Sequence, residues 1–204
     1  MQTRQIGPFS VSAIGLGCMN LSHAYGAPPP AQAAERLLLQ ALDAGVTLFD
    51  TAALYGFGAN ETLVGRVLKP HRHRITLCSK GGMTGALQDV SALDAKDIRR
   101  GMPRFQPEAY AANLQLLAGY RAIAQSAGCS PAQLALAWLL AQGGNVVAIP
   151  GTTQSAHLAE NLGAAAVKID AASLAALDAL FKPQAVTGNR YNAASQGEVD
   201  TEQF

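Results

Sequence analysis

The chain has 204 residues, 49% of them hydrophobic and only 14% charged. It is therefore apolar enough to offset the entropy lost on folding and does not resemble an intrinsically disordered protein. The formal net charge of +1 provides no basic field to attract a nucleic-acid backbone. No apolar run reaches the roughly 20 residues of a bilayer-spanning helix, and no signal peptide follows Met1. We therefore expect a single cytoplasmic domain, with Cys18, Cys78 and Cys129 as buried thiols.

Strand-like and helix-like segments alternate in the first part of the chain. Residues 31–44 carry apolar side chains at helical spacing, and Gly45 ends that predicted helix. The stripe consists of Ala34, Leu37, Leu38, Ala41 and Leu42. The other elements predicted here are a hairpin around Gly7-Pro8, buried strands over 11–19, 46–49 and 75–79, and a helix over 60–68 with Asn60 as N-cap and Pro70 beyond its end. This alternation is typical of α/β proteins with parallel strands and right-handed crossovers.

The alternation stops at residues 81–106, which are rich in glycine and have little periodicity. Elements resume after this stretch. They are a helix over 107–127, a helix from Ser130-Pro131 to about Gln142 that carries Leu134, Trp138 and Leu139 as core residues, a strand over 146–149, a helix over 155–166, and a helix over 171–181 capped by Asp170. We therefore expect about four parallel strands, plus helices.

Two consecutive predicted strands end in chemically active side chains. Asp50 follows the strand over 46–49 and Lys80 follows the strand over 75–79, while Tyr55 lies in the loop after Asp50. Carboxyl ends of parallel strands meet at one edge, where active sites form. An ammonium held by a carboxylate would lower the pKa of a phenol and let it protonate a carbonyl oxygen. The alternative is structural, with a solvated Lys80, a turn-capping Asp50 and an ordinary loop Tyr55.

The fourth strand is followed by Gly151-Thr152-Thr153 at the start of a helix. Free backbone N–H groups at that position favour an anion such as phosphate, although plain N-capping by Thr or Ser explains the same residues. His71 and His73 flank an arginine in a polar link and are read as surface residues. No pair of histidines has the spacing of a metal site, so we expect no metal.

Several of these segments together resemble the aldo-keto reductase family. The matching runs are Gly15-Leu16-Gly17-Cys18-Met19, Phe49-Asp50-Thr51-Ala52-Ala53-Leu54-Tyr55-Gly56, Asn60-Glu61, Ser79-Lys80, Ala148-Ile149-Pro150-Gly151-Thr152-Thr153 and Glu160-Asn161-Leu162-Gly163-Ala164. Their order along the chain matches the family as well, and the similarity covers nearly all of residues 1–182.

The resemblance implies a (β/α)8 TIM-barrel oxidoreductase that transfers a hydride between NADPH, or alternatively NADH, and a small aldehyde or ketone. It implies that Tyr55 is the general acid and that Lys80 and Asp50 tune it. The loop from Asn20 to Pro30, with Tyr25, would shape the substrate pocket. The implied cofactor-binding residues are Gly17, Met19, Asp50, Gly151, Thr152, Thr153, Gln154, His157, Glu160 and Asn161.

The sequence departs from the family in its middle. A complete barrel has eight strands over about 250 residues, and barrel strands four to seven have no counterpart, as if residues were deleted near 82–85. The family's catalytic histidine is in the missing part. Gln154 and His157 also stand where many relatives carry Lys and Arg, which removes charge assistance to a 2′-phosphate.

Three hypotheses follow for a single domain over residues 1–204. The first is a reductase whose given sequence has an internal gap. The second is an inactive remnant that self-associates through the two strand edges which an incomplete barrel leaves unpaired. The third is a module that binds nucleotide through Gly151–Asn161 without turnover. If the barrel strands remain in family order, the strand over 146–149 lies beside the first strand, followed by the second and third.

Overall fold

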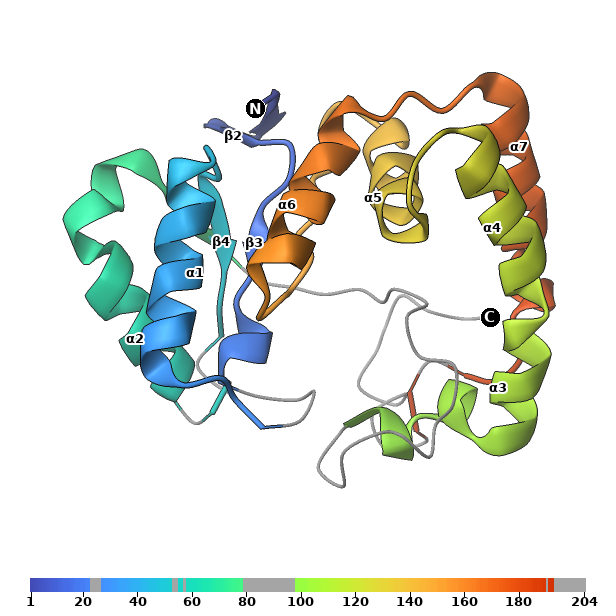
Figure 1. Ribbon diagram of the computed structural model, residues 1–204, viewed down its shortest axis with the longest axis horizontal. Helices are drawn as coiled ribbons and strands as arrows, with labels where there is room; N and C mark the ends of the chain where they lie inside the picture. The colour runs from blue at the N-terminus through green and yellow to red at the C-terminus, as the bar shows by residue number, and fades with distance from the viewer. Residues whose placement is uncertain (23–26, 53–54, 57, 79–97, 190, 193–204) are drawn as a thin grey trace.

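A computed structural model of the chain describes residues 1–22, 27–52, 55–56, 58–78, 98–189 and 191–192. Its central sheet has three parallel strands in the order β3 (Leu16–Gly17), β4 (Leu48–Asp50) and β5 (Thr76–Cys78). The predicted α/β class with parallel strands is confirmed, although these strands are shorter than the sequence suggested. Figure 1 shows them between α1 on one side and α6 on the other.

The segment before Gly151 lies beside β3, as the predicted strand order requires. Parallel bridges join Ile14 to Ala148 and Gly17 to Gly151, and the Gly15 amide donates to the Ala148 carbonyl at 2.8 Å. The segment is not a continuous strand, which corrects the prediction over 146–149. Pro150 has no N–H to extend the ladder. The predicted order is nevertheless confirmed.

The predicted N-terminal hairpin is confirmed. Its antiparallel strands are β1 (Thr3–Ile6) and β2 (Phe9–Ser12), with Ile6 paired to Phe9 across a two-residue turn. Gly7 has a φ of 55°, a value that glycine adopts without steric strain. The hairpin lies at the amino-terminal end of the parallel strands, near the start of the chain (Figure 1).

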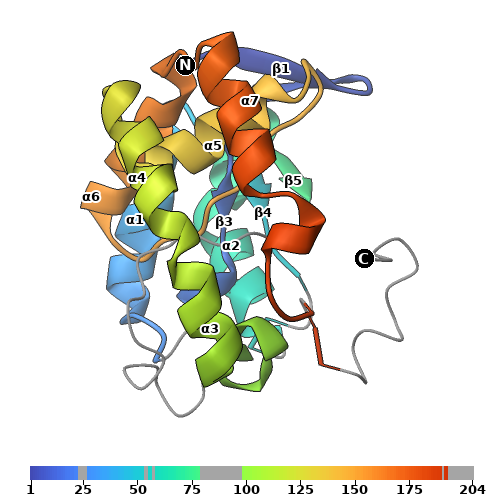
Figure 2. The ribbon, with the colours of Figure 1, turned by 90° about the vertical axis from the view of Figure 1, so that its right-hand side faces the viewer.

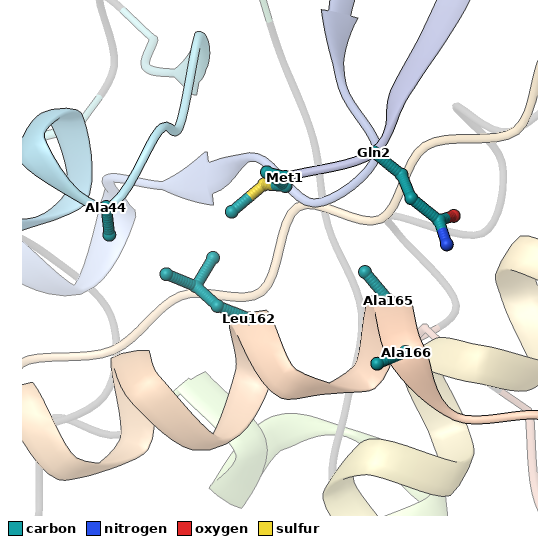
Figure 3. A pocket seen from close by; sticks show the side chains of 6 residues that line it. All are labelled: Met1, Gln2, Ala44, Leu162, Ala165 and Ala166. Atoms are coloured by element: carbon teal, nitrogen blue, oxygen red, sulfur yellow. The ribbon is translucent and has the colours of Figure 1, made fainter.

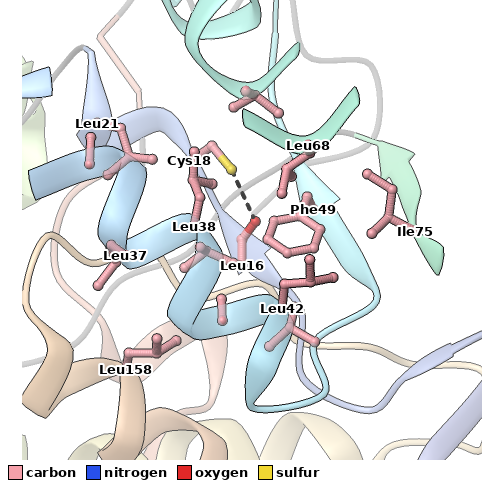
Figure 4. Close-up of a cluster of buried hydrophobic side chains, with 14 residues drawn as sticks. Leu16, Cys18, Leu21, Leu37, Leu38, Leu42, Phe49, Leu68, Ile75 and Leu158 are labelled. Atoms are coloured by element: carbon pink, nitrogen blue, oxygen red, sulfur yellow. Dashed lines mark hydrogen bonds between the residues drawn. The ribbon is translucent and has the colours of Figure 1, made fainter. Parts of the chain in front are cut away.

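Helices α1 (Ala31–Asp43) and α2 (Ala59–Leu68) pack against each other beside the sheet. The buried residues of α1 are the five of the predicted stripe. They join Leu16, Phe49 and Leu68 in the main hydrophobic cluster, where Phe49 is fully buried (Figure 4). Helical spacing in the sequence therefore correctly identified the face of α1 that packs on the sheet.

Five helices follow in the C-terminal part. They are α3 (Pro107–Leu114), α4 (Leu116–Ser126), α5 (Pro131–Ala141), α6 (Ser155–Gly163) and α7 (Ala171–Leu180). Helices α4 and α7 run side by side in both Figure 1 and Figure 2. Together with α5 they enclose a second cluster built on Tyr120, Ala124, Leu134 and Leu177. Among the described residues, no helix is long and apolar enough to cross a membrane.

Short 3₁₀ helices connect several of these elements. They are η1 (Met19–Leu21), η2 (Lys69–Arg74), η4 (Ile98–Gly101), η5 (Pro103–Phe105), η6 (Ala164–Ala166) and η7 (Pro183–Ala185). Pro70 lies at the start of η2, so the chain keeps turning after α2 instead of stopping. His73 is exposed and His71 is half-buried, so the surface reading of this link is correct for His73 and partial for His71.

Helix ends and interruptions account for further differences from the sequence prediction. Ser130 and Asp170 are confirmed as N-caps, Ser130 through a reciprocal capping box with Gln133. The predicted helix over 107–127 is instead two helices, because the Gln115 amide donates to the Ala112 carbonyl three residues back and tightens the turn. Asn60 is not an N-cap, since Gly58 occupies that position.

Two groups of residues predicted as buried are more exposed than expected. Cys18 is buried, but Cys129 is half-buried and Cys78 is exposed, because Cys78 ends β5 at the margin of the described sheet. Trp138 is half-buried and donates its indole N–H to Asp178 at 2.9 Å. Leu139 is 37% exposed, since it lies on the outer side of α5.

Candidate functional site

The carboxyl ends of the parallel strands meet at one edge of the sheet. The Cys18 amide donates to the Asp50 carbonyl at 2.8 Å, and the Thr51 amide donates to the Cys78 carbonyl at 3.0 Å. On the other side of β3, the Gly17 amide donates to the Pro150 carbonyl at 3.0 Å. The predicted convergence of these strand ends is therefore present in the fold. Any site built on it draws on loops distant in sequence.

Asp50 is a buried acid at the end of β4, with an exposed fraction of 3%. It lies close to the Cys18 thiol. Burial raises the pKa of Cys18 to about 12, with the negative charge of Asp50 as the second cause. A buried carboxylate at a strand end can hold a cation or orient a hydrogen-bond donor.

Tyr55 lies in the connection between β4 and α2, and only 4% of its surface is exposed. Its amide donates to the Ala52 carbonyl at 3.0 Å, and its own carbonyl accepts from the Asn60 amide at 3.2 Å. The next residue, Gly56, has a φ of 59°, which lets the chain turn sharply into α2. Lys80 lies outside the described residues, as does Tyr25, so the predicted Asp50–Tyr55–Lys80 arrangement stays a prediction.

Asn60 is a polar residue whose importance the sequence did not reveal. It has no exposed surface. Its side-chain amide donates to the Cys18 carbonyl at 2.7 Å and to the Ser22 hydroxyl at 3.0 Å, and its side-chain oxygen accepts from the Thr51 hydroxyl at 2.6 Å. One signal was available, because Asn60 lies at helical spacing with Val64 and Leu68, the other buried residues of α2.

The backbones at Gly17 and Gly151 approach each other closely. A Cβ atom at Gly17 would lie 2.7 Å from the Ile149 carbonyl oxygen, and one at Gly151 would lie 2.6 Å from the side-chain oxygen of Asn20. Gly17 therefore requires glycine for packing, because the neighbouring atom is backbone, whereas a side chain at Gly151 would require Asn20 to move. Met19 begins η1 directly after this junction. The close approach serves strand packing, whatever else binds there.

The predicted anion-binding segment leads into α6. The Thr152 hydroxyl accepts from the Gln154 amide at 3.0 Å, so part of its role is the local capping that the sequence left open. Gln154 is the N-cap residue, and its own side chain does not cap the helix. The predicted cofactor residues divide here into three groups: exposed Gly151, Thr153, Gln154 and His157, half-buried Glu160, and buried Thr152 and Asn161.

A shallow hollow of about 250 Å³ lies at the opposite end of the sheet (Figure 3). Its lining is Met1, Gln2, Ala44, Leu162, Ala165 and Ala166. Ala44 precedes β4 and Ala166 follows α6, so these residues surround the amino-terminal ends of the strands. The hollow offers no titratable side chain and is not the candidate site. The described residues contain no cluster of His, Cys, Asp or Glu suited to a metal ion.

Comparison with known proteins places this arrangement in a family. The sequence model of the aldo/keto reductase family matches residues 13–100 and 83–182. The aldo-keto reductase yakc [NADP(+)] of Schizosaccharomyces pombe is 25% identical over 332 aligned positions, covering 98% of this chain and 97% of that protein. The aldo-keto reductase str7 of Strobilurus tenacellus is 32% identical over 111 residues, which are 54% of this chain and 33% of that protein.

Solved structures show the same fold. The glycerol dehydrogenase AKR11B4 of Gluconobacter oxydans aligns with a TM-score of 0.73 at 14% identity, covering 94% of this chain and 98% of that one. An aldo/keto reductase of Klebsiella pneumoniae, solved with NADP and acetate, aligns with a TM-score of 0.62 at 20% identity, covering 93% and 98%. The chain belongs to the aldo/keto reductase family, and its fold is an incomplete form of that (β/α)8-barrel lineage.

Proposed function

We propose that the protein is an NAD(P)H-dependent oxidoreductase that reduces a small aldehyde or ketone to an alcohol. The observation that carries this proposal is the burial of Asp50 and Tyr55 at the carboxyl end of β4, 3% and 4% exposed, beside the loop after β3. Burial excludes water from a proton-transferring group, which makes its pKa sensitive to neighbouring charges. Two relatives support the cofactor assignment, because one is named for NADP(+) and another was solved with NADP.

In the proposed reaction, Tyr55 donates the proton that the carbonyl oxygen gains. A bound nicotinamide supplies the hydride that reduces the carbonyl carbon. Lys80 follows β5 by two residues, and β5 pairs with β4, so its ammonium is proposed to lower the pKa of the phenol from the usual value near 10. Asp50 is proposed to hold that ammonium in place.

The residues proposed to bind the cofactor offer backbone N–H groups but few positively charged side chains. Gly17 and Met19 are proposed to contact the cofactor, and Gly151 together with the start of α6 is proposed to hold its adenosine end. The residues assigned to that end are Thr152, Thr153, Gln154, His157, Glu160 and Asn161. We propose NADPH as the cofactor because of the two relatives named for or solved with NADP. Since Gln154 and His157 provide no permanent positive charge to a 2′-phosphate, NADH is the alternative.

We further propose that the chain is one domain with an internal deletion near residues 82–85. The alignment with yakc supports this, because it extends over 332 positions whereas the chain has 204 residues. The family model also matches in two overlapping parts, 13–100 and 83–182. The same observations favour a second candidate, an inactive remnant that binds nucleotide or self-associates. Leu77, in the marginal strand β5, is 36% exposed, and exposed strand edges favour pairing.

Oxidation of NADPH in the presence of a generic aldehyde tests the reductase proposal. The wild-type chain should turn over, and Tyr55→Phe should reduce kcat by about a hundredfold or more, the typical contribution of a positioned general acid. Tyr120→Phe is the matched control. Tyr120 is also buried, but its hydroxyl donates to the Pro131 carbonyl in the second hydrophobic cluster. Equal activities in the two variants would refute the role of Tyr55.

Calorimetric titration with NADPH separates the reductase from the remnant. Binding without turnover, in a protein whose intact mass is 21.2 kDa, would favour the inactive nucleotide-binding form. A concentration-dependent dimer without nucleotide binding would favour self-association. An intact mass well above about 30 kDa, as expected for a chain as long as the 332-position alignment with yakc, would show that the given sequence lacks an internal part.

A further inference from the structure

We propose that Asn60 is a positioning residue that fixes the Tyr55 loop relative to the loop after β3. This inference rests on the proposed reductase function and extends it to a residue outside the proposed chemistry. Asn60 lies in the first turn of α2, where it contacts both loops at once. Its position in the fold therefore couples the general acid to the strand end that carries Met19.

Every polar atom of the Asn60 side chain takes part in this connection. The amide nitrogen donates to Cys18 and Ser22, both in the loop after β3, at 2.7 and 3.0 Å. The oxygen accepts from Thr51, the first residue after β4, at 2.6 Å. Because the side-chain nitrogen must face acceptors and the side-chain oxygen must face a donor, only one orientation of the amide group satisfies all three hydrogen bonds. The side chain therefore defines the relative position of the two loops.

The backbone of Asn60 extends the connection to Tyr55 itself. The backbone N–H of Asn60 donates to the Tyr55 carbonyl at 3.2 Å. The residue that joins the two loops is therefore also hydrogen-bonded to the main chain of the proposed general acid. Gly56 leaves little freedom there, since a Cβ at this position would lie 3.0 Å from the Ser22 carbonyl oxygen. A shift of Asn60 would consequently move Tyr55 relative to the loop after β3.

A purely local role in helix formation does not explain these contacts. Gly58 is the N-cap of α2, with a φ of 91° and no side-chain hydrogen bond. Asn60 is fully buried, where an unmatched polar group is costly, and its side-chain hydrogen bonds are made to residues outside its own helix. Its partners lie 9, 38 and 42 residues away in sequence. The arrangement favours positioning of the loops over capping of the helix.

The test compares Asn60→Ala with variants that remove single bonds, Thr51→Val and Ser22→Ala. Thr62→Val is the control, because its hydroxyl donates to the Gly58 carbonyl in the same helix and joins no second loop. Asn60→Ala should lower kcat by about tenfold to a hundredfold, as a misplaced catalytic group does, with the KM for NADPH within about twofold. Each single-bond variant should show a smaller fall in kcat, and Thr62→Val should show none.

Two further measurements distinguish positioning from a general loss of stability. Tyr120→Phe should lower Tm, because it removes the bond from the Tyr120 hydroxyl to the Pro131 carbonyl, and it leaves the loop connection intact. The fall in kcat per degree of lost Tm is compared between the two variants. If this ratio is no larger in Asn60→Ala than in Tyr120→Phe, the inference is wrong. Hydrogen exchange on the full chain should increase in peptides containing Cys18 and in peptides containing Thr51, and an increase confined to α2 would also overturn it.

Failure of the proposed function remains distinguishable from failure of this inference. A wild-type chain that binds no NADPH and shows no turnover refutes the reductase proposal. Coupled exchange in the Cys18 and Thr51 peptides would still support Asn60 as the connection between the loops, and its absence would refute it. If Asn60→Ala does not fold, Thr51→Val and Ser22→Ala decide the same question through the same measurements.

Discussion

Replacing Gly17 with alanine should destabilise the protein, whereas the same replacement at Gly65 should stabilise it. Gly17 pairs with both β4 and the segment before Gly151. An added Cβ would lie 2.7 Å from the Ile149 carbonyl oxygen, closer than real Cβ atoms approach a neighbour. Gly65 is an exposed residue of α2 with open space around its Cβ position. The two substitutions are chemically identical and differ only in their surroundings.

The size of each effect follows from these surroundings. Overpacking at Gly17 should reduce the free energy of unfolding by about 1–3 kcal/mol. Weakening the bond from the Gly17 amide to the Pro150 carbonyl, 3.0 Å long, should remove about 1 kcal/mol more. At Gly65 the lower backbone entropy of alanine in the unfolded chain should add about 0.5–1 kcal/mol. For a chain of this size, about 1 kcal/mol corresponds to a Tm change of about 2–4 °C.

Thermal and urea unfolding of the three proteins measure the difference. We expect Gly17→Ala to lower Tm by at least about 4 °C and Gly65→Ala to raise it by about 1–4 °C. A Gly17→Ala variant as stable as Gly65→Ala would refute the close junction between β3 and the segment before Gly151. Such a result would also remove the argument that the strand ends converge there.

Two further predictions concern pH. Burial, followed by the charge of Asp50, raises the pKa of Cys18 from 9.0 to about 12, so this thiol stabilises the fold fully below pH 9 and loses that contribution as pH rises towards 12. Urea unfolding between pH 9 and 10 should show a fall of up to about 1.4 kcal/mol per pH unit from this thiol. The fall should be smaller in Cys18→Ala, in which Cys129 and Tyr120, whose pKa values are also raised by burial, still contribute; identical slopes would contradict the burial of this thiol. The backbone amide of Ser173, followed by the Ser173 hydroxyl, lowers the pKa of the Asp170 carboxyl. The carboxylate therefore stabilises α7 at pH values above its ordinary pKa of 3.8, and this stabilisation is lost as the pH falls below 3.8. The Tm of Asp170→Ala should lie below that of the wild type at pH 7 and approach it in acid, and a constant difference at all pH values would argue against the charged cap.

The sequence was sufficient to predict those structural features that depend on the residues of a single helix or strand. The stripe on α1 was predicted residue by residue, because helical spacing alone decides which side chains face the sheet. The caps at Ser130 and Asp170 were also predicted, since a cap bonds an amide only three residues away. The interruption at Gln115 was missed because no glycine or proline marks it. It depends on a single tightened hydrogen bond.

The candidate site was predictable in its strand ends but not in the contacts that join them. Asp50 and Tyr55 were identified from their place after a strand, and both are buried. The exposure of Cys78 could not be deduced in the same way. The sequence of β5 is an apolar run, and the elements packed against β5 determine which of its residues are buried. Sequence patterns describe one element, whereas exposure depends on the elements around it.

Asn60 illustrates the kind of residue that sequence reasoning assigns to the wrong role. Its type and place before an apolar stripe favour an N-cap, and N-capping needs only nearby partners. Its actual partners are brought near by the order β3-β4-β5, which places the loops after β3 and β4 side by side. The alternation of strands and helices predicted parallel strands, and their order was predicted from the family order that the resemblance implies. A polar residue on the buried stripe of a helix that follows a parallel strand should therefore be considered as a connection between neighbouring loops before it is assigned as a cap.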